Sequence, residues 1–227
     1  MTRTIIVAGA SSGIGAATAR VFADAGDTVH AAARREISED GITGHRLDVT
    51  DREAVAAFAA PFDSVDALIV AAGTNIKKRR LHELTPASWD EVIDANLNGP
   101  FNLLHAFHDA LRAAQGTFIV ISSVSGAWTD RSGPAYQASK AGAIALTRGA
   151  GFEVDGAIRT TAILPGVVDT PILESRPEPP DAEMRAQMLM SEDVAAACKF
   201  VVDLPPRAFV PELTILPTAL QAIGKTM

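Results

Sequence analysis

A glycine-rich stretch near the N-terminus constrains the fold of this chain more than any other feature. It runs from Val7 to Gly15, follows the short apolar run Thr4–Ala8 and opens a helical pattern that extends from Gly13 to Ala25. Glycines at such a strand–helix turn let the backbone approach a pyrophosphate, which the amides and dipole of the helix N-terminus stabilise. The spacing Gly-x3-Gly-x-Gly departs from the common Gly-x-Gly-x-x-Gly, so a purely structural turn is the alternative. The predicted phosphate-binding residues are Gly9, Ser11, Ser12, Gly13, Ile14 and Gly15.

Apolar β-branched runs alternate with longer helical patterns along the whole chain. This rhythm is typical of a parallel sheet with helices on both faces. The predicted fold is therefore α/β, a parallel sheet of about seven strands with helices on both faces. The expected strands are Thr4–Ala8, Thr28–Ala33, Gly44–Leu47, Ala67–Val70, Thr117–Ser122, Ile158–Leu164 and Leu213–Leu216. The expected helices are Gly13–Ala25, Asp51–Phe58, Ser88–Ala113, Pro134–Phe152 and Ser191–Asp203, with a shorter one within Asp181–Met190.

The composition excludes several classes of protein. The 227 residues suit a single α/β domain spanning 1–227, and the net charge of −7 argues against binding to nucleic acid or anionic membranes. No apolar run approaches the 18 or so residues of a membrane span. The single cysteine, Cys198, favours a reducing cytoplasm. Histidine, cysteine and carboxylate residues show no metal-ligand spacing.

A hydroxyl-rich stretch and a later helix carry the candidate catalytic groups. The only tyrosine, Tyr136, stands four residues before Lys140, so both share one face of the predicted helix. An ammonium beside a phenol stabilises the phenolate, and we expect Lys140 to lower the pKa of Tyr136 for acid–base chemistry. A helix surface pair is the alternative interpretation. Because a strand alternates its faces, Ser122 and Ser123 cannot both point into one site.

The ordered motifs of the chain resemble those of the short-chain dehydrogenase/reductase family. The resemblance rests on Gly9, Gly13, Gly15, Asp48, Ala71-Ala72-Gly73, Asn96, Ser123, Tyr136, Lys140 and Pro165-Gly166. It implies a doubly wound, Rossmann-type NAD(P)-binding domain that also carries the catalytic residues. One departure is Val70-Ala71-Ala72-Gly73, where the family often has an asparagine before Ala-Gly; this loss alters how the central sheet is tied together but removes no catalytic group.

The resemblance also implies a role for each matching residue. Tyr136 would be the general acid/base, Lys140 would contact the nicotinamide ribose, and Ser123, not Ser122, would hold the substrate oxygen. Asn96 would position a water in a proton relay to Lys140, with a helix-interior asparagine bonded to backbone as the alternative. The remaining implied cofactor contacts are Asp48 and Val49 at the adenine, Ala72 and Gly73 after the fourth strand, and Pro165, Gly166, Val168 and Thr170 around the nicotinamide.

The end of the second predicted strand indicates which dinucleotide binds. An acidic residue there favours NAD(H), whereas a basic residue accommodates the 2′-phosphate of NADP(H). Here Ala33 takes the acidic position, and Arg34 and Arg35 follow. The sequence therefore favours NADP(H) over NAD(H), although Glu36 leaves a route to NAD(H) and the arginines could be a solvated pair.

The leading hypothesis is an NADP(H)-dependent oxidoreductase that interconverts a carbonyl and a secondary alcohol. A dinucleotide-sensing protein without turnover, an NAD-dependent member of the same fold and a lyase or epimerase remain alternatives. A lid at 171–190, with Met184, Met188, Leu189 and Met190 as an apolar wall or as ordinary core, would cover the small-molecule substrate. Arg176, Arg185 and the basic run Lys77–Arg80 leave an acidic substrate open, or are solvated. The family's paired helices imply a homodimer or homotetramer.

Overall fold

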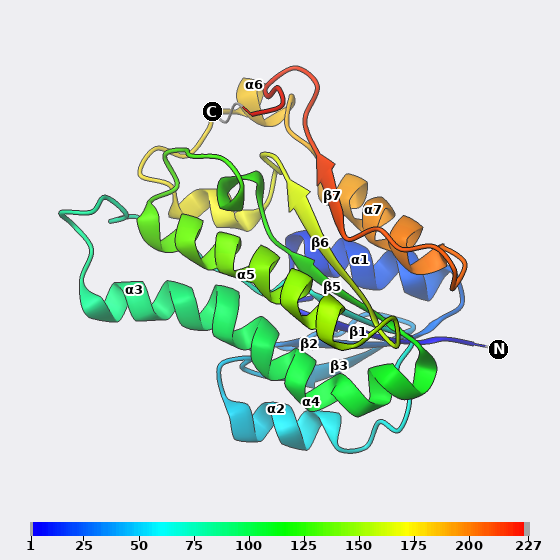
Figure 1. The fold of residues 1–227 in the computed structure, drawn as a ribbon. Coiled ribbons are helices and arrows are strands. Elements are labelled where there is room, and N and C mark those ends of the chain that lie inside the picture. Colours follow the sequence, from blue (N-terminus) through cyan, green and yellow to red (C-terminus); the bar gives the residue numbers. More distant parts are fainter. Residues whose placement is uncertain (1, 225–227) are drawn as a thin grey trace.

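One parallel sheet organises the molecule. The computed structural model describes residues 2–224, so the ends of the predicted domain, residue 1 and residues 225–227, lie outside it. All neighbouring strands pair in parallel in the order β3-β2-β1-β4-β5-β6-β7 (Figure 1). The predicted doubly wound sheet is thus confirmed. Its strands are β1 (Thr4–Ala8), β2 (Thr28–Ala33), β3 (Ile42–Arg46), β4 (Ala67–Val70), β5 (Thr117–Ile121), β6 (Arg159–Pro165) and β7 (Glu212–Ile215).

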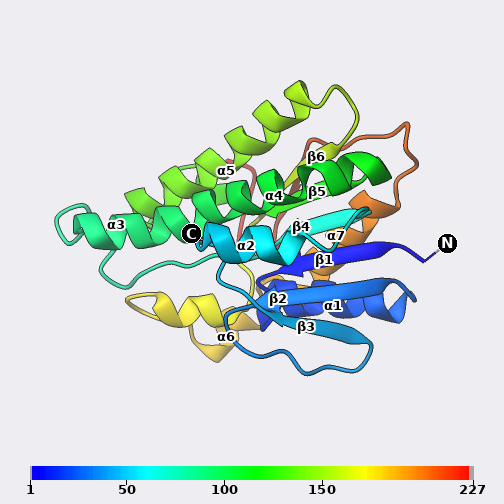
Figure 2. The ribbon, with the colours of Figure 1, turned by 90° about the horizontal axis from the view of Figure 1, so that it is seen from below.

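Alternate residues of each central strand enter two separate cores. Ile6, Leu68 and Phe118 face one side, whereas Ile5, Ile69 and Ile119 face the other, and all six are fully buried. Helices cover both faces (Figures 1 and 2), because a parallel strand buried on both sides must be shielded on both. The first side packs against α2 (Arg52–Ala59), α4 (Gly99–Ala114) and α5 (Pro134–Glu153), and the second against α1 (Gly13–Asp24) and α7 (Ser191–Asp203).

The helix expected over Ser88–Ala113 is not continuous. It divides into α3 (Pro86–Ile93), a π-helical segment (Asp94–Asn98) and α4. Proline at position 100 lacks an amide hydrogen for the regular helical pattern, and the side chain of Asn96 is committed to bonds outside the helix. Such π-helical turns are frequent at functional sites. The shorter helix predicted within Asp181–Met190 is present as α6 (Ala182–Arg185).

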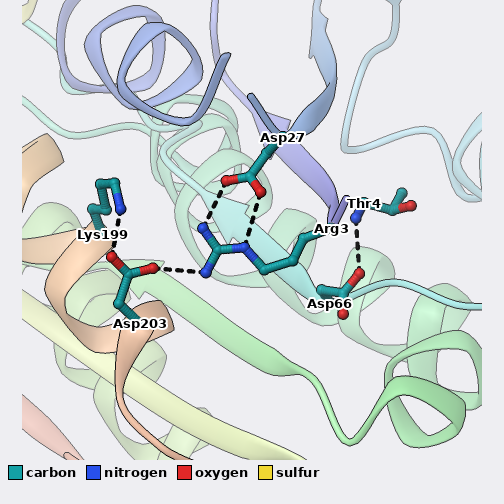
Figure 3. Close-up of polar contacts among 6 residues, drawn as sticks. All are labelled: Arg3, Thr4, Asp27, Asp66, Lys199 and Asp203. Carbon is teal, nitrogen blue, oxygen red and sulfur yellow. Dashed lines mark hydrogen bonds and ion pairs between the residues drawn. The ribbon is translucent and has the colours of Figure 1, made fainter. Parts of the chain in front are cut away.

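An ion-pair network ties the elements together at the amino ends of the strands (Figure 3). The Arg3 guanidinium lies between two carboxylates: it donates to Asp27 at 2.9 and 2.7 Å and to Asp203, at the end of α7, at 2.6 Å. Lys199 pairs with the same Asp203. Thr4 donates its amide to Asp66 at 2.8 Å. The network fixes β1, β2 and α7 at this edge, opposite the carboxyl ends of the strands.

Candidate active site

A large cavity opens at the carboxyl ends of the strands, where open α/β sheets bind ligands. Its volume is about 1330 Å³. Of the residues that the sequence singled out as catalytic or cofactor-binding, all but Asn96 line it. These are Gly9, Ser11, Ser12, Gly13, Ile14, Gly15, Arg34, Arg35, Asp48, Val49, Ala72, Gly73, Ser123, Tyr136, Lys140, Pro165, Gly166, Val168 and Thr170.

The turn after β1 is closed so tightly that it requires glycine. Gly9 has a φ of +86°, and a Cβ there would lie 2.3 Å from the amide nitrogen of Ala72. A Cβ on Gly15 would lie 2.3 Å from the carbonyl oxygen of Gly9. The turn therefore packs directly on the segment after β4 and presents the N-terminus of α1 to the cavity. A cradle of this kind, with a helix dipole behind it, fits the pyrophosphate of a dinucleotide.

Arg35 lies over the glycine-rich turn. Its guanidinium donates to Ser11 Oγ at 3.0 and 3.2 Å and to Ser12 Oγ at 2.9 Å. Arg34 also lines the cavity. Nearby, the amide and hydroxyl of Thr50 donate to Asp48 at 3.0 and 2.8 Å, and the amide is the main cause of the lowered pKa of Asp48. This end of the cavity thus holds both positive charge and an ionised carboxylate.

The two serines after β5 point in different directions. Ser122 donates its hydroxyl to the carbonyl of Lys140 at 2.8 Å, so it is used in packing α5 onto the strand end. Ser123 lines the cavity, and its Oγ lies 3.1 Å from Ser125 Oγ. Ser125 in turn donates to the carboxylate of Asp130. Sequence reasoning missed Ser125 and Asp130, because their relation to Ser123 depends on the turn between β5 and α5.

Tyr136 and Lys140 share a face of α5, as the spacing predicts. The Lys140 Nζ lies 5.6 Å from the centre of the Tyr136 ring and donates to the carbonyl of Ile121 at 2.9 Å. Burial raises the pKa of the phenol to about 12, although a hydrogen bond with Ser123 opposes this. We expected Lys140 to lower the pKa of Tyr136, but burial is the largest effect and raises it, so this expectation is wrong. The ammonium is directed at a backbone carbonyl, and burial lowers its own pKa to about 8.

Lys140→Met is expected to remove a pH dependence of stability. Between the folded pKa of about 8 and the ordinary value of 10.5, the unfolded chain binds a proton that the folded protein lacks, so stability rises with pH. The free energy of unfolding of the parent minus that of the variant should therefore rise by about 2 kcal/mol from pH 8 to 10. Burial raises the pKa values of Tyr136 and Cys198 to about 12, but both proteins carry these groups, so their effect cancels in the difference. Urea denaturation at pH 7, 8, 9 and 10 measures the effect, and parallel curves for both proteins would contradict it.

Asn96 is fully buried in the π-helical segment and does not line the cavity. Its Oδ1 accepts from the Thr74 amide at 2.7 Å, and its Nδ2 donates to the Thr74 carbonyl at 2.9 Å and to Ser139 Oγ at 3.0 Å. A Cβ on Gly73 would meet both this Oδ1, at 3.1 Å, and the Nζ of Lys140, at 3.4 Å. Asn96 thus holds the segment after β4 beside Lys140, and its part in a proton relay stays a prediction.

The segment after β6 is pinned from two sides. Val167 donates its amide to Gln221 Oε1 at 2.7 Å, and Val168 forms a parallel bridge with Leu189. Beyond it, residues 171–190 form a 3-10 helix (Pro171–Ser175), a loop and α6, which together cover part of the cavity. Of the four apolar residues expected in a lid wall, only Met184 lines the cavity. Met188 and Leu189 are buried in the core, which agrees with the alternative interpretation, whereas Met190 is exposed and fits neither.

The basic run 77–80 contains an unexpected buried residue. Arg79 is 6% exposed and lines the cavity together with Arg80 and, from the lid, Arg176. Sequence reasoning favoured a solvated loop for this run, and for Arg79 that interpretation is wrong. In contrast, Arg185 of α6 pairs with Asp169 at 2.9 Å and with Glu174. Charge density alone could not separate the buried arginine from its exposed neighbours.

Within residues 2–224, no group of three or more histidine, cysteine, aspartate or glutamate side chains could hold a metal ion. No helix in the same range is long and apolar enough to cross a membrane.

Comparison with known proteins agrees with this geometry. The family model described as short chain dehydrogenase matches residues 3–181. A cis-4-hydroxycyclohexanecarboxylate dehydrogenase from Sinomonas cyclohexanicum is 37% identical, with 88% of each chain covered. An alcohol dehydrogenase from Thermococcus sibiricus complexed with 5-hydroxy-NADP superposes with a TM-score of 0.85 and is 28% identical, with 98% of this chain and 99% of that chain covered. A serine dehydrogenase complexed with NADP+ superposes with a TM-score of 0.88 and is 27% identical, with 99% of this chain and 98% of that chain covered.

The fold and the cavity define an α/β protein with a glycine-rich turn at a large cavity on the carboxyl edge of its parallel sheet. The chain belongs to the short-chain dehydrogenase/reductase family, as the motifs indicated. It is an NAD(P)-dependent oxidoreductase.

Proposed function

We propose that the protein interconverts a carbonyl and a secondary alcohol, with NADP(H) as the favoured cofactor. The observation that carries the proposal is that Ser123, Tyr136 and Lys140 line the same cavity as the glycine-rich turn. The relative from Sinomonas cyclohexanicum is named for the oxidation of a ring hydroxyl, which is a secondary alcohol. This relative supports the proposed type of reaction.

Tyr136 is the proposed proton donor. With a pKa raised to about 12, its phenol is protonated at neutral pH, which is the form that carbonyl reduction uses. The hydrogen bond from Ser123 stabilises the phenolate that remains after transfer. The bound dinucleotide supplies the hydride. Ser123 and Tyr136 together hold the substrate oxygen, where charge develops during the reaction.

Lys140 has a proposed role in binding the cofactor. Its Nζ lies 5.6 Å from the centre of the Tyr136 ring and next to Gly73, and the residue lines the cavity. From this position it can donate to a ribose hydroxyl of the dinucleotide, as the family resemblance implies. The other proposed cofactor contacts come from the glycine-rich turn, Asp48, Val49, Ala72, Gly73 and the segment Pro165–Thr170.

The preference for NADP(H) is proposed to depend on Arg34 and Arg35. The buried Ala33 places no carboxylate at the end of β2 to repel a 2′-phosphate, and both arginines line the cavity. Arg35→Ala combined with Arg34→Ala should raise the dissociation constant for NADPH about 10- to 100-fold, because charge-assisted hydrogen bonds to the phosphate are lost. The constant for NADH should change less than about threefold.

Fluorescence titration of both dinucleotides measures this effect. Arg207→Ala, at an exposed arginine that does not line the cavity, is the matched control. Equal losses for NADPH and NADH would refute the role of the pair. Tighter binding of NADH by the parent enzyme would overturn the cofactor preference itself.

The proposed activity is tested by NADPH consumption with a panel of ketones, aldehydes and keto acids, including 4-oxocyclohexanecarboxylate. We expect one NADPH oxidised per product formed. A protein that binds NADPH tightly but consumes none with the whole panel would instead be a dinucleotide sensor. Product formation without net NADPH consumption would indicate a lyase or epimerase.

Three further predictions from the sequence belong to this proposal. The chain is proposed to act as a single domain with a substrate lid near 171–190, part of which lines the cavity. A homodimer or homotetramer through α4 and α5 follows from the family resemblance, and size-exclusion chromatography with light scattering tests it. The cytoplasmic location rests on the single cysteine.

A further inference from the structure

Two arginines stand in the wall of the cavity near Tyr136 without a role in the proton transfer. Arg79 is anchored from both sides: its Nε donates to the Ile76 carbonyl at 2.9 Å, and its Nη2 donates to the Ser175 carbonyl of the lid. Its backbone also packs against Gly133, where a Cβ would lie 2.5 Å from the Arg79 carbonyl oxygen. The guanidinium is therefore fixed in position. Arg176 follows Ser175 directly and lines the same cavity.

Neither arginine has a carboxylate partner of its own. Among residues 2–224, the ion pairs of the protein involve Arg185 and other arginines but neither Arg79 nor Arg176. Burial lowers the pKa of both guanidinium groups, and the charge of Arg176 lowers that of Arg79 further. A buried cation without a counter-ion is unfavourable, and buried arginines are normally paired. Burying Arg79 without a carboxylate partner therefore lowers the stability of the fold, and both arginines act on the proposed proton donor, Tyr136.

One carboxylate, Asp130, acts on both arginines but is already engaged. Its oxygens accept from Ser125 Oγ, from the Ser132 amide at 2.8 Å and from the Ser132 hydroxyl. It compensates one of the two positive charges through space. Glu178 and Asp181 also line the cavity, but neither forms an ion pair among the described residues, and Asp181 caps α6. The group formed by Arg79, Arg176 and Asp130 keeps one net positive charge.

On the basis of the proposed oxidoreductase function, we propose that Arg79 and Arg176 bind the carboxylate of the substrate, which is a hydroxy acid or keto acid. Guanidinium groups bind carboxylates through paired hydrogen bonds, which fixes the direction of the ligand. A single net charge suits a monoanion better than a phosphate dianion. Both arginines act electrostatically on the phenol of Tyr136, so a carboxylate bound to them lies at the same end of the cavity as the reacting oxygen.

Matched keto acids and keto amides test this proposal by kinetics. The pairs are acetoacetate with acetoacetamide and 4-oxopentanoate with 4-oxopentanamide, in the presence of NADPH. For at least one pair we expect kcat/KM to be at least 10-fold higher for the acid. Arg176→Gln should lower this value at least 10-fold for the acid, mainly through KM, and less than threefold for the amide. Arg207→Gln is the control at an exposed arginine outside the cavity.

Arg79 is tested by two variants because of its burial. Arg79→Lys keeps the positive charge but removes the planar pair of N–H donors. Arg79→Gln removes the charge as well as the paired guanidinium donors. If the site is correct, the loss for the acid is larger with glutamine than with lysine, while the amide is affected little by either. Equal losses for acid and amide in every variant would overturn the proposal, and so would parent activity that does not distinguish the two.

Calorimetry separates the anion site from the proposed reaction. Butyrate, butyramide and methyl phosphate are titrated into the parent and Arg176→Gln proteins loaded with NADP+, so no turnover is needed. We expect butyrate to bind the parent at least 10-fold more tightly than either other probe and to lose this advantage in the variant. Butyramide or methyl phosphate binding as tightly as butyrate would overturn the assignment. If NADPH is never consumed but butyrate binds as expected, the reaction is wrong and the anion site stands.

Discussion

Tyr136→Phe is expected to lower kcat for carbonyl reduction by about 1000-fold, because the variant loses the hydroxyl that we propose gives a proton to the substrate oxygen. The ring stays the same size, so the packing of α5 against its neighbours should be kept. The dissociation constant for NADPH should change by less than about threefold. Stopped-flow measurement of NADPH consumption under single-turnover conditions isolates the chemical step from product release.

Two controls make this result interpretable. Ser125→Ala removes the hydroxyl between Ser123 and Asp130 but leaves Tyr136 in place, and it should lower kcat by about 10-fold, as expected for the loss of one hydrogen bond. The melting temperature of the phenylalanine variant should lie close to that of the parent. A Tyr136→Phe enzyme with more than a tenth of the parent kcat would remove Tyr136 from the acid–base role.

Gly9→Ala is expected to destabilise the protein by about 2–5 kcal/mol, the sum of a strained positive φ and an overpacked contact. Its added Cβ would lie 2.3 Å from the Ala72 amide nitrogen and 2.6 Å from the Ala72 Cα, and these are backbone atoms that no side-chain rotation can move. Relief requires the turn to move away from β4. NADPH binding should therefore weaken by more than 10-fold even at temperatures where the variant remains folded.

Gly149→Ala is the matched control for the glycine substitution. Gly149 lies on α5, is exposed, and an added Cβ there would meet no atom within 4 Å. Alanine in an exposed helix should stabilise the protein by roughly 0.5–1 kcal/mol. Thermal and urea denaturation measure both variants, and NADPH titration gives the second readout. A Gly9→Ala protein as stable as the parent and with unchanged affinity would contradict the described packing of the turn.

The arrangement of charges near Tyr136 shows how stability and function are balanced. Lys140 and Arg79 are both nearly inaccessible to solvent, and burial disfavours the charged form of each. Both are also fixed by backbone carbonyls, of Ile121 and Ile76. Such groups commonly mark functional sites, since the fold gains nothing from burying them unpaired.

The sequence by itself determined the sheet and most of the predicted catalytic and cofactor-binding residues that line the cavity. Strand positions follow from local apolar runs, and the motifs at 9–15, 123, 136 and 140 lie at strand ends or on one helix face, where spacing along the chain fixes their direction. For the same reason the difference between Ser122 and Ser123 could be anticipated from the alternation of a strand.

Only the tertiary structure decided which groups act on one another across elements. Burial is the largest cause of the raised pKa of Tyr136, and Arg79 and Arg176, from segments far along the chain, also act on it. Asn96 is drawn out of a regular helix by the backbone of Thr74, which no local pattern encodes. Arg79 and Arg176 come together because a loop after β4 and the lid meet at the carbonyl of Ser175. Contacts between segments far apart in the chain depend on the packing of the whole fold, and this packing turns a basic run into a candidate site for the substrate's carboxylate.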